Sequence, residues 1–122
     1  MNEKSETEII KAWIIVHKVE YKSSTYEANF WAVEYLMRLA HDDPEKLFNL
    51  IPKILLNDNS EKIILHVGAG PLQDIVNLYS DEYIEKISIL ARTLIDFRAA
   101  LKNVIVDDDC NHELGRLINS FK

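Results

Sequence analysis

Apolar residues recur at intervals of three and four along most of this chain, which is the pattern of amphipathic helices. Near the N-terminus, one such stripe runs through Ile9, Trp13 and Val16. Ser5 and Glu8 precede it with the spacing of a capping box, in which the hydroxyl and the acid each bond a free backbone amide. The pattern therefore predicts a first helix that begins just after Ser5.

A second Ser-x-x-Glu box, formed by Ser24 and Glu27, predicts a helix over about residues 25–40. This segment is apolar nearly all round, and its narrow polar stripe consists of Glu27, Glu34, Arg38 and His41. A helix with so little polar surface needs partners on several sides. We expect it to lie at the centre of the fold.

The next segment combines the end of one helix at His41 with the start of another. Asp43 is placed to cap a third helix, and Pro44 to occupy its first position, with the helix running to about residue 57. Pro52 lies inside this helix, where it removes one backbone hydrogen bond and clashes with the preceding turn. We expect a kink or an early stop just before it, near Ile51.

Residues 62–67, KIILHV, are short and β-branched enough to form a strand. No second segment offers a convincing partner strand, so we expect Lys62–Val67 to form a short helix.

The segment 66–76, HVGAGPLQDIV, poses a choice between a phosphate-binding loop and a hinge between helices. A dinucleotide-binding fingerprint beginning at Gly68 needs a glycine or alanine where Gln73 stands, and no Gly-Lys-Ser/Thr follows. The phosphate interpretation fails on both counts. We expect a hinge, in which Gly68 or Gly70 takes the left-handed conformation that ends one helix and Pro71 starts the next.

The C-terminal part continues the helical pattern. Ser80 and Asp81 offer the next cap, and residues 82–106 predict one long helix or two helices that break near Thr93. Residues 107–122 predict a capped, short terminal helix. The order helix, proline-started turn, helix also recurs at an offset of 27 residues. Antiparallel helix pairs of this kind are the unit of a short α-solenoid.

These elements predict an all-α protein with six to eight helices in antiparallel pairs, arranged as a short HEAT-like α-solenoid or as an irregular bundle. We expect a single helical domain over residues 1–122. Its parts are an N-terminal helix and linker (1–23), a paired-helix core (24–103), and an acidic turn with a short helix (104–122).

Composition narrows the classes of function. The 122 residues carry a net charge of −6, with 20 acids against 14 bases. An acidic chain with dispersed lysines is a poor match for nucleic acid, whereas a basic protein partner is a natural complement. We expect no membrane association, because no apolar run reaches the roughly 18 residues of a membrane span.

The polar start MNEKSETE lacks the character of a secretory signal, and Cys110 is the only cysteine, so no internal disulfide can form. We expect a cytoplasmic protein; the pattern does not predict its oligomeric state.

Two acidic clusters are the candidates for chemistry. His41, Asp42 and Asp43 could bind a metal, but adjacent residues at a helix junction cannot all converge on one ion, so we expect a structural turn. Residues 107–113 lack the alternate ligands and central glycine of a calcium loop, so we expect a solvated cap or an acidic contact surface. The candidate partner-binding residues are Asp42, Asp43, Glu45, Asp107, Asp108, Asp109 and Glu113.

Cys110 could act as a nucleophile only with a base close by, and His112 is poorly placed because side chains at i and i+2 of a helix point apart. We therefore expect no catalytic residue, no metal ligand and no cofactor-binding residue.

Two segments carry a resemblance to a known family, FWAVEYLMRLAHDDPEKLFNLIPKIL and HVGAGPLQDIVNLYSDEYIEKI. The Trp-Ala-Val-Glu helix, the His-Asp-Asp-Pro-Glu turn, and Ala-Gly-Pro-Leu-x-Asp followed by a Tyr/Phe-Ile helix resemble a family of uncharacterised bacterial proteins known only as a domain of unknown function. The likeness covers about residues 30–98, and the tail after Lys102 departs from it. It implies a bacterial origin and a helical domain; the family has no established activity, so no catalytic residue is implied.

Together these observations predict a non-catalytic protein that binds another protein. Its sharpest form is a bacterial immunity protein that neutralises a cationic toxin, such as a nuclease, through an acidic face. The alternative is a small metal-binding protein or enzyme that uses His41, Asp42 and Asp43, or the cluster from Asp107 to Glu113.

Overall fold

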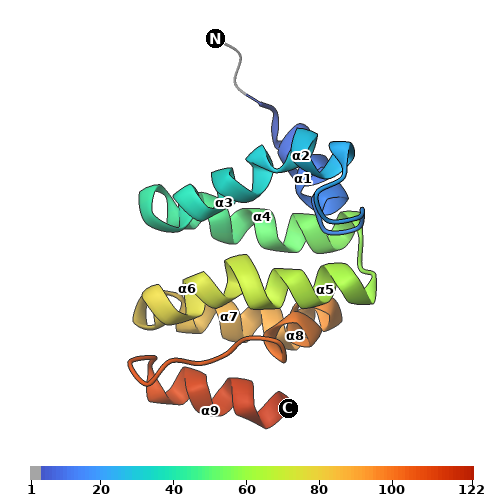
Figure 1. Cartoon of the computed structure of the whole chain (residues 1–122). Coiled ribbons are helices and arrows are strands. Elements are labelled where there is room, and N and C mark those ends of the chain that lie inside the picture. Colours follow the sequence, from blue (N-terminus) through green and yellow to red (C-terminus); the bar gives the residue numbers. More distant parts are fainter. Residues whose placement is uncertain (1–3) are drawn as a thin grey trace.

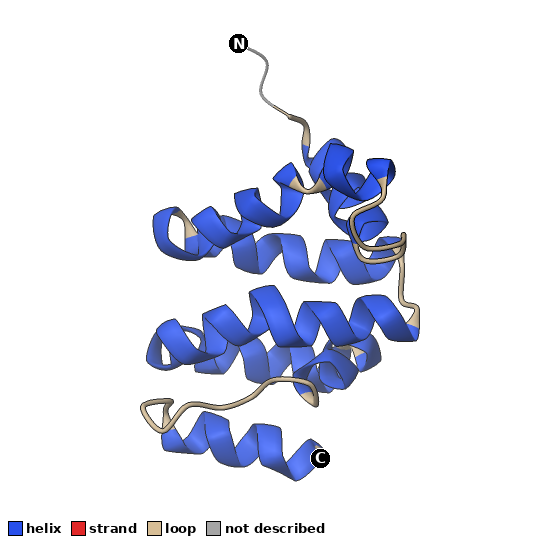
Figure 2. Cartoon of the chain, viewed as in Figure 1, coloured by secondary structure: helices blue, strands red, loops and turns tan. Residues whose placement is uncertain are grey.

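The computed structural model describes residues 4–122. Residues 1–3, the start of the polar N-terminal segment, lie outside the described range. The described part is all-helical, without strands, as Figure 2 shows. Its elements are α1 (Glu6–Val16), α2 (Ser24–Asn29), α3 (Trp31–Asp42), α4 (Pro44–Asn57), α5 (Glu61–Val67), the π-helix η1 (Gly68–Leu72), α6 (Gln73–Leu78), α7 (Ser80–Thr93), α8 (Ile95–Leu101) and α9 (His112–Phe121).

The helices stack in antiparallel succession from the N-terminal end of the molecule to α9 (Figure 1). α3 and α4 form one pair, and the continuous rod of α5, η1 and α6 forms the next pair with α7. With α5, η1 and α6 taken as one continuous rod, the described residues form eight helices. The all-α prediction of six to eight helices is confirmed.

The core is centred on α4 and the rod, rather than on the helix predicted from residues 25–40. α4 buries Leu47, Phe48, Leu50, Ile51, Ile54 and Leu55. The predicted helix is interrupted at Phe30, α2 buries no residue, and Met37 on α3 is 59% exposed. α3 does pack on several sides, against α1, α2, α4 and η1. The prediction that this segment is the centre of the fold is wrong, because Phe30 and Val33 are only partly buried and Met37 is exposed.

Two of the four predicted helix caps are confirmed. Ser5 accepts from the Glu8 amide at 3.1 Å within a complete capping box, and Asp43 accepts from the Lys46 amide at 3.2 Å. The box of Ser24 and Glu27 is wrong, because α2 begins one residue earlier and Ser23 is the cap.

α4 continues through Pro52 to Asn57, so the early stop near Ile51 is wrong. The residues that follow the proline include Ile54 and Leu55, both buried in the core. Their packing compensates for the one backbone hydrogen bond that the proline removes.

The predicted hinge at residues 68–71 is also wrong. α5, η1 and α6 follow one another without a break, and none of the glycines in the described residues has a positive φ angle. A π-turn closes hydrogen bonds five residues apart, which accommodates the missing amide hydrogen of Pro71 without ending the helix. The repeat at an offset of 27 residues therefore fails in its second copy, where the proline lies inside a rod.

The remaining elements follow the sequence more closely. Residues 62–67 are helical as expected, and the long C-terminal segment breaks at Leu94 into α7 and α8. Ser80 is not a cap: it is the first residue of α7, and its hydroxyl accepts from the Asn111 amide at 2.9 Å. α9 is capped by Asn111, which accepts from the amides of Glu113 and Leu114.

Candidate functional site

The segment between α8 and α9 is fastened to α6 by side-chain amides. The Ile105 amide donates to Gln73 Oε1 at 2.8 Å, and Asn77 donates to the Ile105 carbonyl at 2.8 Å while accepting from the Asp107 amide at 2.9 Å. Gln73, which excludes the dinucleotide fingerprint, thus has a structural role. These bonds hold the loop that carries Asp107, Asp108 and Asp109 against α6.

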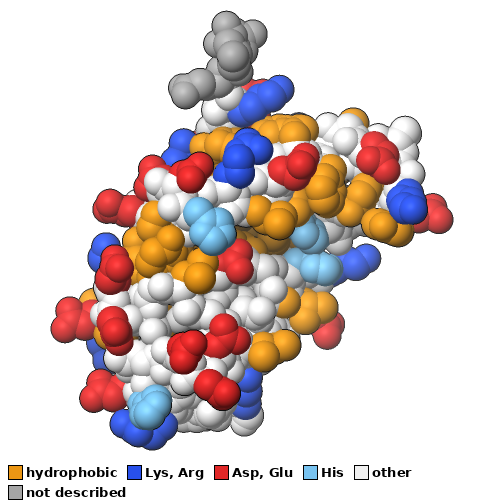
Figure 3. Space-filling view, turned by 60° about the vertical axis from the view of Figure 1, so that its left-hand side comes forward, with side chains coloured by type: hydrophobic (Ala, Val, Ile, Leu, Met, Phe, Trp, Pro, Cys, Tyr) orange, Lys and Arg blue, Asp and Glu red, His pale blue; other side chains and the backbone are white. Residues whose placement is uncertain are grey.

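The turns at one end of the helices bring acidic side chains together. The α3–α4 turn, the start of α7 and the loop before α9 all lie at the end of the molecule on the left of Figure 1. We call the exposed acids on these turns the acidic edge: Asp42, Asp43, Glu45, Asp81, Glu82, Asp107, Asp108, Asp109 and Glu113. Figure 3, which brings that side forward, shows acidic side chains distributed along its length.

Electrostatic effects on two side chains link the three turns. Burial raises the pKa of Tyr83, and the negative charges of Glu45, Glu82 and Asp43 raise it further. Burial likewise raises the pKa of the Cys110 thiol. The Ser80 hydroxyl opposes this shift, and the negative charges of Asp107 and Asp81 add to it. Asn111 bonds Asp81 at 2.7 Å, so the start of α7 and the last loop are in direct contact.

All seven acids predicted from the sequence lie on this edge, and the structure adds Asp81 and Glu82. From the sequence, Asp81 is predicted only as part of a helix cap, and Glu82 has no predicted role. The sequence signal is that two adjacent acids stand in the first turn of the helix that begins at Ser80.

The alternative chemical sites do not assemble. Within residues 4–122, no three His, Cys, Asp or Glu side chains are placed to hold a metal ion. Asp43 faces its own helix as a cap. Cys110 is buried, at 4% exposure, while His112 is exposed.

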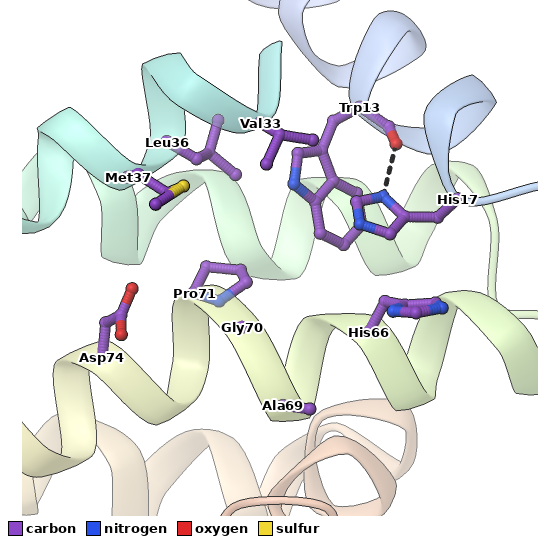
Figure 4. Close-up of a pocket in the computed structure, with 10 residues that line it drawn as sticks. All are labelled: Trp13, His17, Val33, Leu36, Met37, His66, Ala69, Gly70, Pro71 and Asp74. Carbon is purple, nitrogen blue, oxygen red and sulfur yellow. Dashed lines mark hydrogen bonds between the residues drawn. The ribbon is translucent and has the colours of Figure 1, made fainter. Parts of the chain in front are cut away.

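A second feature, which the sequence did not predict, is a groove between the α1–α3 layer and the rod. We call it the histidine groove and define it by Trp13, His17, Met37, His66, Pro71 and Asp74; its volume is about 290 Å³. Figure 4 shows the two histidines at one end of it and Asp74 at the other.

The two histidines face each other across the layers. Their ring centroids are 4.5 Å apart, and the His17 ring lies 4.0 Å from that of Trp13. His17 Nδ1 bonds the Trp13 carbonyl at 2.8 Å. A carbonyl oxygen can only accept, so Nδ1 carries the proton and the neutral ring leaves Nε2 as an acceptor.

Burial lowers the pKa of both imidazoles. For His17 the proximity of His66 acts in the same direction, against the opposing effect of the Trp13 carbonyl; for His66 the charge of Lys62 adds to burial. Both rings are therefore neutral at physiological pH. Nothing local in the sequence signals this pair, because the residues lie on helices far apart in the chain.

In the described part of the chain, no helix combines the length and apolar character needed to cross a bilayer.

Comparison with known proteins matches residues 19–119 to the model of a family of unknown function, DUF6869. The matched region includes the tail after Lys102, so the departure expected there is wrong. Neither the curated proteins nor the solved structures gave a match. The chain belongs to the family of unknown function DUF6869.

Proposed function

We propose that this protein is a non-catalytic binding protein whose acidic edge contacts a basic protein partner. The observation that carries the proposal is the convergence of nine exposed acids from three turns of the chain onto one end of the helices. Negative potential over one surface steers a cationic partner and speeds association.

The edge also has the rigidity that an interface needs. Its acids stand on helix ends and on a loop fastened by Gln73 and Asn77, so little conformational freedom is lost on binding. Leu78, which ends α6 beside these turns, is 51% exposed and supplies an apolar contact among the charges.

The sharpest form of the proposal is an immunity protein that covers a cationic toxin domain, such as a nuclease. Its support is the acidic edge, whose nine exposed acids complement a strongly basic surface. The candidate partner is a toxin-like domain encoded next to this gene.

The test is calorimetric titration of that domain with the native protein and with two triple variants. One variant neutralises three edge acids, Asp42→Asn, Asp107→Asn and Asp108→Asn. The control neutralises three exposed acids outside the edge, Glu27→Gln, Glu34→Gln and Glu61→Gln.

We expect tight binding by the native protein and the control, and binding at least tenfold weaker by the edge variant. Equal weakening by both variants would show that only net charge matters. A neighbouring gene without a toxin-like product, together with no complex between this protein and any basic neighbour, contradicts the immunity form.

A further inference from the structure

We propose that the histidine groove binds a small organic amine, namely a primary ammonium group joined to an aromatic or alkyl body. This goes beyond the acidic edge, because it assigns a separate site built from different residues.

The charge requirement comes from Asp74. Its carboxylate is half-buried at one end of the groove, and within residues 4–122 no hydrogen bond or ion pair to it is present. Burial raises the pKa of Asp74, and the charge of His41 only partly opposes this. A partly buried carboxylate without a donor is unfavourable to the fold, and an ammonium group in the groove would relieve that cost.

The middle of the groove accepts an apolar body. Leu36, Met37 and Pro71 form its walls, and an added Cβ on Gly70 would meet nothing within 4 Å, so space is open there. Met37 is exposed, and its flexible thioether can adapt to a ring or a chain. A volume of about 290 Å³ is at the small end of ligand pockets, which favours a compact ligand.

The far end offers a second acceptor. Because His17 Nδ1 is committed to the Trp13 carbonyl, its Nε2 has a free lone pair, and His66 lies against it. The groove therefore presents a carboxylate at one end and a neutral imidazole acceptor at the other. This arrangement fits an amine whose body carries a hydroxyl or ring N–H donor opposite the ammonium group.

The probe for the test is tyramine, a phenol joined to an ethylammonium group. Two analogues each remove one feature: 4-(2-hydroxyethyl)phenol lacks the ammonium charge, and phenethylamine lacks the phenolic donor. Binding is followed by the imidazole proton signals of His17 and His66 in NMR titrations of the whole protein.

We expect saturable shifts of both histidine signals with tyramine, at least tenfold weaker binding of the uncharged analogue, and intermediate binding of phenethylamine. Asp74→Asn should weaken tyramine binding at least tenfold. Asp108→Asn, the same chemical change on the acidic edge, should leave it unchanged.

A groove-filling variant, Gly70→Leu, provides a second measurement that does not alter charge. It should abolish the tyramine shifts while the helical circular dichroism spectrum stays native. The proposal is overturned if tyramine causes no saturable shift, if the uncharged analogue binds equally well, or if Asp74→Asn or Gly70→Leu binds tyramine like the native protein. Each of these outcomes leaves the acidic edge unaffected, because binding of the basic partner uses other residues.

Discussion

Gly68 lies directly against the backbone of Ala100, since a Cβ atom built on this glycine would come within 2.1 Å of the Ala100 carbonyl oxygen. It would also come within 2.7 Å of Asn103 Cβ. The glycine is therefore required by the close approach of the rod to α8, and not by a turn. The same contact explains why Gly68 lies inside a continuous rod.

Gly68→Ala should destabilise the protein by about 3 kcal/mol, because backbone atoms rather than a flexible side chain must move. Urea unfolding measures the change. Gly70→Ala is the matched control: its Cβ meets nothing within 4 Å, so the better helix former should leave stability unchanged or raise it by up to about 1 kcal/mol. Equal stability of native protein and Gly68→Ala would contradict the close contact.

The pair of histidines predicts loss of stability in mild acid. Both folded pKa values lie below the ordinary 6.5, so the unfolded chain takes up these protons first and stability falls as the pH drops below about 6.5. Melting temperatures from about pH 8 to about pH 5 report this. The double variant His17→Asn, His66→Gln should flatten the curve, whereas the exposed control His112→Gln should keep its shape. An unchanged slope in the double variant would exclude the pair as its source.

The contact of Asp58 with Lys18 predicts a separate loss of folding stability in stronger acid. Hydrogen bonds from Lys18, at 2.7 Å, and from the Ser60 amide hold the pKa of Asp58 at about 2. Its stabilisation is complete above the ordinary value of 3.8 and is lost as the pH falls towards 2. Asp58→Asn should cost roughly 1–2 kcal/mol at neutral pH by urea unfolding.

The exposed pair of Glu6 and Lys53 is the control for this prediction. Its side chains are about half exposed, and Glu6→Gln should cost well under 1 kcal/mol. A similar cost for both substitutions would mean that Asp58 contributes only as a surface charge.

The ionised carboxylate of Asp74 is expected to lower the stability of the fold, whereas that of Asp58 raises it. Because burial raises the pKa of Asp74, its ionised carboxylate opposes folding at neutral pH, and Asp74→Asn should raise the melting temperature. The gain should shrink as the pH falls through the folded pKa of Asp74 and vanish below about 3.8. A lower melting temperature would show that the carboxylate stabilises the fold.

The sequence predicts the helices whose signals are local. Ser5 with Glu8, and Asp43 with Pro44, place two starts correctly because a cap depends on residues a few positions apart. The hinge predicted at Gly68 and Pro71 is wrong because glycine and proline occur both in turns and inside packed helices. For Gly68, the contact with the distant Ala100 favours the packed helix.

The acidic edge and the histidine groove also differ in how far the sequence predicts them. The acids of the edge are visible in the sequence as clusters at predicted turns, although only the stacking of helices brings them to one end. His17, His66 and Asp74 are not visible as a group, because each one fits the helical pattern of its own segment.

The most direct test of the acidic edge is the rate at which the basic partner associates, measured by stopped flow over a range of salt concentrations. We expect the association rate of the native protein to fall steeply as salt rises. The rate of the edge variant should be about tenfold lower at low salt and should depend less on salt. The control variant should follow the native curve. Coincident curves for the edge and control variants would contradict a binding role for this edge.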